Sequence, residues 1–357
     1  MMDKNSPFEI DFDSYIRQSE TEKQEIGRLW QTAIGLQKVD GLSTSAYMYE
    51  TAKRNIAGEI TIEEAKGLID SYYETRRGRA ENGAGTEEAD KVSVRIREIL
   101  AEKTFSFTPD LLLSIHKRLF DGVFYEVKAG QFRDYNISKR EWVLDGESVL
   151  YANADMIRQT LEYDFGQEKA FDYSALSKED AVKHLARFVA NIWQIHPFGE
   201  GNTRTTAVFA IKYLQSLGFD VSNEPFEKNS WYFRNALVRA NYTNMSAGIY
   251  MNTEYLEMFF RNLLLGEQNA LRNRHCHIRA RNLPVNNRNL PANLSVNKTE
   301  RAVLELLLEN SRYTYDELAA KIGRSRETVR ANLRSLEKKH LIAREGADKS
   351  GFWIVKT

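Results

Sequence analysis

The sequence predicts a mainly α-helical fold. Apolar residues recur at helical spacing through most of the 357 residues. Before residue 270, a single stretch, residues 130–151, has the character of paired strands. A hydrophobic fraction of 42% and the presence of only six prolines favour a compact globular chain over a disordered one. The length permits two or three domains with cores of their own.

Composition and charge exclude several classes of protein. Lys plus Arg and Asp plus Glu each total 50, so the net charge gives no signal for nucleic acid or membrane binding, and any basic surface must be local. The single Cys276 excludes an intrachain disulfide framework and favours a reducing compartment. Residues 1–7 lack the apolar core of a signal peptide, and no run approaches the ~20 apolar residues of a membrane span. We therefore expect a cytoplasmic protein with no membrane partner.

Residues 1–88 are expected to form an N-terminal helical region. Residues 14–39 place apolar side chains at helical spacing, and Gly41 ends this helix because glycine tolerates positive φ. A second helix follows through residues 46–56, and Thr61 with Glu64 three residues later predicts the capped start of another. The expected inner face of the first helix comprises Ile16, Ile26, Leu29, Trp30, Ala33, Ile34 and Leu36.

Residues 89–270 are expected to form a helical core. One helix covers residues 90–102, and Pro109 after Thr108 is typical of the start of the next. This next helix carries His116 on an apolar surface, where a hydrogen-bonded core histidine is favoured over a ligand. An aromatic-rich segment near residue 231 predicts the start of a later helix.

A small β-hairpin is expected at residues 142–151. Asp145-Gly146 stands between the apolar segments 142–144 and 149–151, which is a signal for a two-residue turn between strands. Such a hairpin can be a plain surface feature.

Residues 196–204, His-Pro-Phe-Gly-Glu-Gly-Asn-Thr-Arg, form a loop between two apolar helices. The helix before the loop begins after Ser177, and the helix after it covers residues 205–214. A helix N-terminus concentrates free N–H groups and the positive end of the helix dipole, and Gly201 lets the backbone come close to a bound anion. The loop therefore predicts a phosphate site with rigid support on both sides.

The side chains of this loop suit phosphoryl or nucleotidyl transfer. Arg204 offers a planar charged fork to phosphate oxygens, and Glu200 is a hard oxygen ligand of the kind that Mg²⁺ takes beside nucleotide phosphates. His196, with an unperturbed pKa near ~6.5, can accept a hydroxyl proton at neutral pH. In the alternative, His196 caps the preceding helix and residues 200–202 form an ordinary turn, which the length of the pattern disfavours.

These residues resemble the signature of the Fic family, His-x-Phe-x-(Asp/Glu)-Gly-Asn-Gly-Arg-x-x-Arg. The resemblance implies a Fic-type helical core that transfers AMP from ATP, with Mg²⁺, to a Ser, Thr or Tyr hydroxyl of a target protein. By position, it implies His196 as the base and Glu200 as the Mg²⁺ ligand. The phosphate-binding residues that it implies are Gly201, Asn202, Thr203 and Arg204.

The resemblance extends beyond the signature. It implies that the hairpin is a flap on which the target protein docks, and that Tyr232 and Asn235 flank the adenine. Two positions depart from the signature, because Thr203 replaces its second Gly and Ala207 stands at its final Arg. The lost Arg is an expected partner of the terminal phosphate, so these departures bear on the pose and the identity of the nucleotide.

The N-terminal region resembles the antitoxin-like module that inhibits Fic proteins. The hallmark of that module is a helix ending (Ser/Thr)-x-x-x-Glu-(Gly/Asn), whose Glu obstructs the terminal phosphate. The matching residues are Leu36, Asp40 and Gly41, with Leu in place of the hydroxyl residue and Asp in place of Glu. The resemblance implies that Asp40 is inhibitory. The alternative, a simple helix end, is slightly disfavoured because a carboxylate is unfavourable at a helix C-terminus.

The last part of the chain changes character. Residues 271–297 are rich in Arg and Asn and read as a linker, in which His275-Cys276-His277 does not complete a tetrahedral metal set. Residues 298–357 predict helices, a tight turn, a capped third helix and a hairpin, a pattern that resembles a winged helix-turn-helix. The expected elements are helices 299–309, 315–322 and 326–337, the turn at Gly323, the cap at Ser325 and strands 341–344 and 352–355.

Two functions from different classes follow. One is an autoinhibited protein adenylyltransferase; a variant of it uses another phosphate-containing donor or removes AMP. The other is a DNA-binding regulator with a nucleotide-sensing Fic core, favoured by the arginines on or beside the third helix of the winged helix. These arginines are Arg324, Arg326, Arg330 and Arg334. The winged fold also serves as a docking or dimerisation module, which would make the protein a homodimer.

Overall fold

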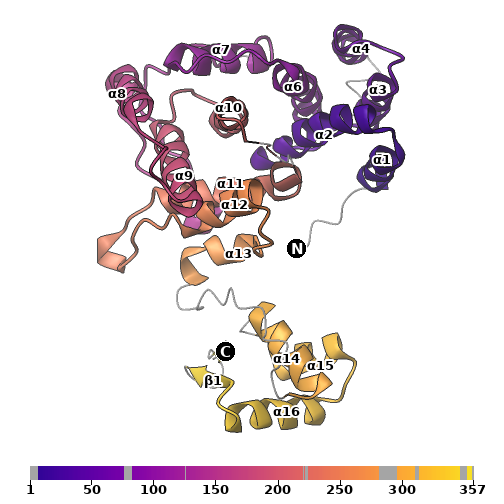
Figure 1. The fold of residues 1–357 in the computed structure, drawn as a ribbon, viewed down its shortest axis with the longest axis vertical. Helices are drawn as coiled ribbons and strands as arrows, with labels where there is room; N and C mark the ends of the chain where they lie inside the picture. Colours follow the sequence, from indigo (N-terminus) through magenta and orange to yellow (C-terminus); the bar gives the residue numbers. More distant parts are fainter. Residues whose placement is uncertain are drawn as a thin grey trace. The chain divides into compact units, whose positions relative to one another are not determined.

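The fold is mainly α-helical, as the sequence predicts (Figure 1). A computed structural model describes residues 7–75, 83–124, 126–219, 221, 224–280, 296–309, 313–345 and 352–355. The chain divides into two compact units, residues 1–278 and 279–357, and each is treated by itself. Among the described helices, none combines the length and the apolar character that a membrane span requires.

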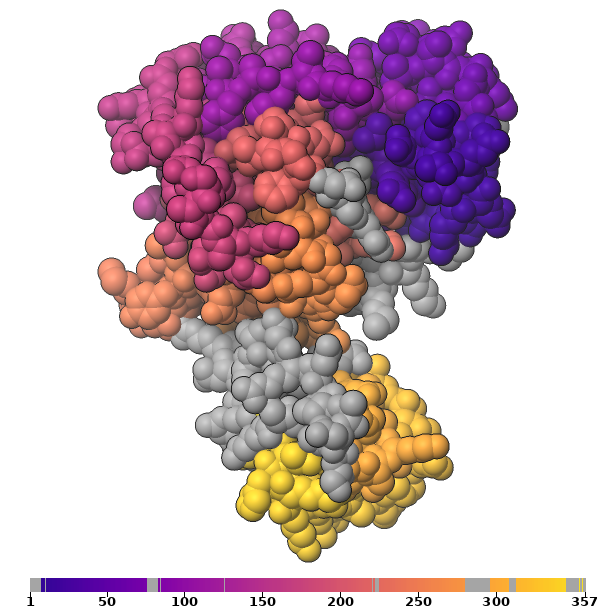
Figure 2. All heavy atoms as spheres, viewed as in Figure 1, coloured from indigo at the N-terminus to yellow at the C-terminus, as the bar shows by residue number. Residues whose placement is uncertain are grey.

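The N-terminal region is a set of helices: α1 (Pro7–Gln18), α2 (Thr21–Gly35), the 3-10 helix η1 (Leu36–Asp40), α3 (Ala46–Ala57) and α4 (Ile62–Glu74). Of these, α2 packs against α6 (Ala84–Ala101) and α11 (Glu224–Ala240). In the space-filling view the atoms of the region lie directly against the rest of the first unit (Figure 2). The single helix expected over residues 14–39 is wrong. The break lies at Glu20, whose extended backbone (φ −62°, ψ 156°) makes it the N-cap residue of α2. The Ser19 hydroxyl donates to the carbonyl of Tyr15 and so satisfies an acceptor at the end of α1.

Local signals for helix ends and faces are confirmed. Gly41 ends η1 at a φ of 71°, and Thr61 and Glu64 form a reciprocal capping box at the start of α4. Of the seven residues expected on the inner face, Ile16, Trp30, Ala33, Ile34 and Leu36 are buried, and Ile26 and Leu29 are half-buried. These signals act over three or four residues, so they survive the break between α1 and α2.

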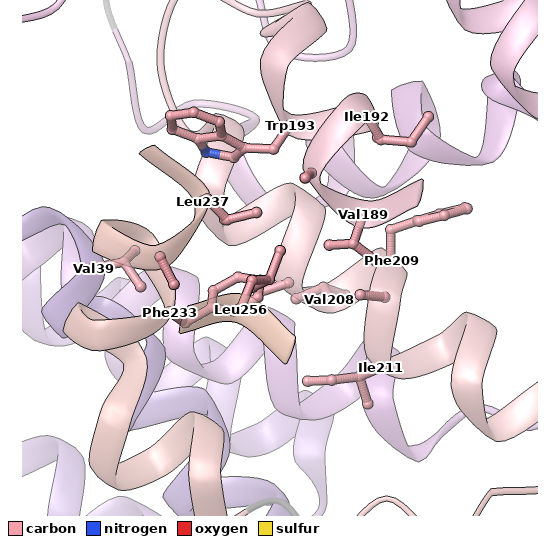
Figure 3. Packing of buried hydrophobic residues seen from close by; sticks show 14 of the residues in the cluster. Val39, Val189, Ile192, Trp193, Val208, Phe209, Ile211, Phe233, Leu237 and Leu256 are labelled. Carbon is pink, nitrogen blue, oxygen red and sulfur yellow. The ribbon is translucent and has the colours of Figure 1, made fainter. Parts of the chain in front are cut away.

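Helix α10 (Asn202–Ser216) is the central element of the first unit. All its residues from Asn202 to Leu214 are buried, and Figure 3 shows its apolar side chains packed against those of neighbouring helices. The helices of this part are α6 (Ala84–Ala101), α7 (Pro109–Phe120), α8 (Ile157–Ala170), α9 (Lys178–Ile195), α11 (Glu224–Ala240), α12 (Glu254–Leu265) and α13 (Asn273–Cys276). Residues 196–201, between α9 and α10, are therefore held by a helix on each side.

The hairpin expected at residues 142–151 forms its turn but not its strands. Asp145 and Gly146 both have positive φ, and the Glu147 N–H donates to the carbonyl of Leu144, as in a two-residue turn. However, residues 142–144 form the 3-10 helix η2 (Trp142–Leu144), and no strand is assigned among the described residues 149–151. The expectation of paired strands is wrong, because Val143 and Leu144 are both buried instead of alternating between two faces.

The second unit has the expected winged helix elements. They are α14 (Lys298–Glu309), α15 (Tyr315–Ile322), α16 (Arg326–Lys338), β1 (Ile342–Glu345) and β2 (Phe352–Val355). Gly323 ends α15 at a φ of 67°, and the hydroxyl of Ser325 caps α16. The two strands pair antiparallel, with Ile342 opposite Val355. Residues 281–295 of the expected linker lie outside the described residues, whereas α13, in the first part of that linker, packs against α11.

Candidate functional site

His196 occupies the junction where α9 ends. Its backbone is left-handed, with φ 50° and ψ 58°, and its N–H donates to the carbonyl of Trp193. Its ring Nδ1 lies 3.1 Å from the same carbonyl oxygen. Because a carbonyl only accepts, we assign the ring proton to Nδ1, which leaves Nε2 with a free lone pair.

The surroundings of His196 keep its ring neutral. Burial, followed by the positive charge of Lys139 and, after the opposing effect of the Trp193 carbonyl, by those of Arg234 and Arg133, holds the pKa of His196 well below its usual value. The ring of Tyr151 lies against the imidazole, with the centroids 4.1 Å apart. A neutral imidazole with a free Nε2 can accept a proton at neutral pH.

Arg133 ties the loop to the rest of the unit, a role that the sequence did not reveal. Its guanidinium donates to the backbone carbonyls of His196, Ile195, Tyr135 and Ala152. Its own N–H donates to the carbonyl of Pro197 over 2.9 Å. Arg133 is 5% exposed, and an arginine in a polar stretch gives no sequence signal for such burial.

Two loop side chains expected at the phosphate instead hold the loop in shape. The amide of Asn202 accepts from the Phe198 N–H at 2.9 Å and donates to the Phe198 carbonyl at 2.7 Å. The hydroxyl of Thr203 accepts from the indole N–H of Trp193 at 3.0 Å. Both side chains thereby position the loop, and the first turn of α10 presents backbone N–H groups of the kind that bind anions at helix N-termini.

Glu200 contacts Lys139 through its side chain and His116 through its backbone. The Glu200 carboxylate lies 2.7 Å from Lys139 Nζ, and its backbone carbonyl lies 3.0 Å from His116 Nε2. His116 Nδ1 accepts from the Gly130 N–H, so the ring is hydrogen-bonded at both nitrogens. Burial lowers the pKa of His116 to about 4, which identifies it as a neutral structural histidine.

Arg204 is buried among acidic and amide side chains. Its Nε lies 2.8 Å from Asp40 Oδ2, its Nη1 donates to Gln37 at 3.0 Å, and its Nη2 pairs with Glu88. The guanidinium lies over the ring of Phe120. The structure thus brings Asp40 of the N-terminal region into direct contact with Arg204 of the loop.

A cavity of about 510 Å³ contains the charged groups of the site. It is lined by Val39, Asp40, Gly41, Leu42, Glu88, Phe124, Lys139, Glu200, Arg204, Trp231 and Arg234. Such a volume suits a small-molecule ligand. Expected site residues Asp40, Glu200 and Arg204 therefore share one cavity.

Tyr232 and Asn235 are not among the residues that line this cavity, contrary to the expectation that they flank the adenine. Both are buried: the Tyr232 hydroxyl donates to the carbonyl of Tyr255, and the Asn235 amide donates to Asn273. Trp231 and Arg234 line the cavity in their place. Each of these two residues lies one position before the residue predicted from the sequence. The sequence of α11 is apolar on several sides and does not show which face of the helix is covered.

Residues 106–214, which include the loop and the helices on both sides, match the model of the Fic/DOC family. The chain contains a Fic domain. Residues 296–343 match the model described as winged helix-turn-helix DNA-binding. Together the two matches identify a Fic domain followed by a winged helix domain, as the sequence motifs predict.

Similar solved structures include Fic proteins at low identity. A Fic family protein from Desulfovibrio desulfuricans G20 is 11% identical, with a TM-score of 0.43, and the match covers 99% of this chain and 97% of that one. The N-terminal Fic domain of the Bep8 protein from Bartonella sp. 1-1C is 18% identical, with a TM-score of 0.39, and the match covers 52% of this chain and 88% of that one. The BepC protein from Bartonella tribocorum, with bound AMPPNP, is 20% identical, with a TM-score of 0.36, and the match covers 51% of this chain and 90% of that one.

A relative outside these structures is the ribonucleoside-diphosphate reductase small chain of Ostreid herpesvirus 1 (isolate France). It is 26% identical over a segment that covers 26% of this chain. The chain spans only 17% of the length of that relative. The identification of the Fic domain therefore rests on the family model.

Proposed function

We propose that the Fic domain transfers AMP from ATP to a hydroxyl group of a target protein, and that the N-terminal region inhibits this transfer. The observation that carries the proposal is the loop itself. It holds a neutral His196 with a free Nε2, and it places Glu200 and Arg204 in one cavity. A base, a metal ligand and a phosphate-binding cation are the groups that nucleotidyl transfer requires.

In this proposal, His196 Nε2 accepts the proton of the target hydroxyl. The hydroxyl oxygen forms a bond to the α-phosphorus of ATP, the bond from that phosphorus to the bridging oxygen breaks, and pyrophosphate leaves. Charge that develops on the α-phosphate is stabilised by the N–H groups at the start of α10. Arg133 and Asn202 hold the loop so that these groups stay in place.

Glu200 fits the role of a Mg²⁺ ligand. Its side chain is 54% exposed, it lines the cavity, and its partner Lys139 can exchange for an ion. Mg²⁺ is commonly held by one or two carboxylates together with substrate phosphates, so a single protein ligand is sufficient. When bound, the ion would neutralise charge on the leaving pyrophosphate.

The target protein is proposed to dock beside the turn at Asp145-Gly146. Trp142 and Leu150, on the two sides of this turn, are exposed. The Leu150 carbonyl accepts from the side chain of Gln194, two residues before His196. A peptide that binds along this segment would place a hydroxyl near the base.

Inhibition is supported by the contacts of Asp40. Its carboxylate pairs with Arg204 and with Arg234, and both arginines line the cavity. A phosphate of ATP and this carboxylate would compete for the same positive charges. The N-terminal region would therefore lower activity by occupying the site, while the fold is unchanged.

The test is incubation with Mg²⁺ and ATP labelled at the α-phosphate, in the presence of cell lysate. An inhibitory coupling of about 1–3 kcal/mol predicts that Asp40→Ala raises protein labelling roughly 5- to 150-fold. Adding His196→Ala to that variant should lower labelling by roughly 10²- to 10⁴-fold, because the base is lost. Glu22→Ala, which removes an exposed carboxylate from α2, is the matched control and should leave labelling unchanged.

Two outcomes would contradict this proposal. Labelling that does not depend on His196 would exclude the assigned base. ATP binding without labelling in any variant would exclude ATP as an AMP donor here and favour a nucleotide-sensing regulator or a different phosphate-containing donor.

The winged helix supports a second function, binding of DNA. On α16, Arg326, Arg330 and Arg334 are exposed and follow one another at four-residue spacing. The adjoining face of the helix buries Val329 and Leu333 in the core of the second unit. A basic face on the third helix of a winged helix matches the surface that contacts phosphates and base edges.

Replacement of Arg330 and Arg334 by glutamine should weaken binding to a mixed-sequence duplex. Each phosphate contact contributes about 0.9 to the slope of log K against log salt, so the slope should fall by roughly 1 to 2. Fluorescence anisotropy at several salt concentrations measures both quantities. Arg158→Gln, an exposed arginine of α8 in the first unit, is the control, and equal binding by all these proteins would exclude α16 as the DNA-contacting helix.

A further inference from the structure

The carboxylate of Asp40 bridges two arginines from different parts of the Fic unit. Its Oδ2 lies 2.8 Å from Arg204 Nε, and its Oδ1 lies 2.8 Å from Arg234 Nη1. Arg204 belongs to the first turn of α10 and Arg234 to α11. Arginine binds carboxylate and phosphate alike, so a carboxylate held between two guanidinium groups indicates a position that a phosphate can also take.

Arg234 is held in place independently of Asp40. Its Nη2 lies 3.1 and 3.3 Å from the two carboxylate oxygens of Glu141, and its Nη1 also donates to the Val39 carbonyl at 3.2 Å. The ring of Trp231 lies beside the guanidinium. Because Glu141 is 2% exposed and fixes Nη2, the guanidinium keeps its orientation when Asp40 withdraws.

Of the cations that line the cavity, Arg204 and Arg234 contact Asp40. Lys139 is paired with Glu200, and two of the three nitrogens of Arg204 are taken by Gln37 and Glu88. Position 207, one turn along α10 from Arg204, holds a fully buried alanine and supplies no charge. An anion at the position of Asp40 therefore meets Arg204 Nε from one side and Arg234 Nη1 from the other.

We propose that Arg234 is a phosphate-binding residue of the nucleotide site, and that Asp40 occupies the place of this phosphate in the inhibited state. The inference rests on the proposed function for the identity of the nucleotide, but not for the existence of the anion site. The ligand group is a phosphate, whose oxygens can take the positions that the Asp40 carboxylate oxygens hold between the two guanidinium groups. Adenosine, which has no phosphate, would make no contact with Arg234.

The test measures binding by isothermal titration calorimetry in the Asp40→Ala background, with ATP, inorganic pyrophosphate and adenosine as separate probes. Addition of Arg234→Gln should weaken the binding of ATP and pyrophosphate roughly ten- to a hundredfold, because charge-assisted hydrogen bonds are lost. Binding of adenosine should not change. Arg261→Gln breaks a similar pair, between Arg261 of α12 and Glu267 beyond its end, outside the cavity; it is the matched control and should change none of the affinities.

A second variant separates binding from folding. Arg234→Lys keeps the charge and its pairing with Glu141 but loses the fork, so it should weaken pyrophosphate binding by less than Arg234→Gln does. Equal pyrophosphate affinity in Asp40→Ala and in Asp40→Ala/Arg234→Gln would overturn the proposal. So would AMP transfer that is independent of Arg234, although the proposed function would then stand. Pyrophosphate binding that requires Arg234 in a protein without AMP transfer would support the anion site and contradict the proposed function.

Discussion

Substitution of Arg133 by methionine is expected to abolish AMP transfer and to lower the free energy of unfolding by about 3–4 kcal/mol. The methionine stem fills much of the same space but donates no hydrogen bonds. The carbonyls of His196, Ile195 and Ala152 would lose a charged donor in a buried region. Each buried acceptor left unsatisfied costs about 1–3 kcal/mol, and the loop that carries the base would change its conformation to find new partners.

The measurement combines urea unfolding with labelling from ATP in the Asp40→Ala background. Arg187→Met, an exposed arginine on the same helix that leads to the loop, is the matched control and should leave both quantities unchanged. If Arg133→Met retained the stability and the labelling of its parent, the loop would be held by α9 and α10 alone. A variant with normal stability but no labelling would place the effect of Arg133 on His196 itself.

The helical frame could be predicted because its signals are local. The capping box of Thr61 and Glu64, the cap at Ser325 and the turn at Gly323 each depend on residues a few positions apart. The turn at Asp145-Gly146 was predicted for the same reason. Its strands were not formed, since strand pairing depends on burial on two faces, which a short apolar segment does not specify.

The contacts that complete the site join residues that are distant in sequence. Arg133 and His196 are 63 residues apart, Arg204 and Gln37 are 167 apart, and Arg234 and Asp40 are 194 apart. A single sequence contains no periodicity at such separations. The loop could therefore be recognised from its own residues, whereas the arginines that hold it or share its cavity became visible only in the folded chain.

Gly201→Ala should disrupt the loop even though it adds only one methyl group. Gly201 has a φ of +73°, which costs an alanine about 1–2 kcal/mol, and the added Cβ would lie 2.4 Å from Cε2 of Phe120. Phe120 is fully buried beneath the guanidinium of Arg204, so it cannot move without displacing that side chain. Overpacking adds about 1–3 kcal/mol, and the first turn of α10 would shift away from the phosphate position.

The control separates backbone strain from the overlap with Phe120. Gly248 also has positive φ, at +62°, but a Cβ there would meet nothing within 4 Å. Gly248→Ala should therefore lower the free energy of unfolding only by the cost of positive φ for an alanine, about 1–2 kcal/mol. Its labelling from ATP should be unchanged. Gly201→Ala should lose more stability than this and should no longer label its target. Partial recovery by Phe120→Leu in the same chain would locate the defect at this contact, whereas equal losses in the two alanine variants would show that the approach of Gly201 to Phe120 is unimportant.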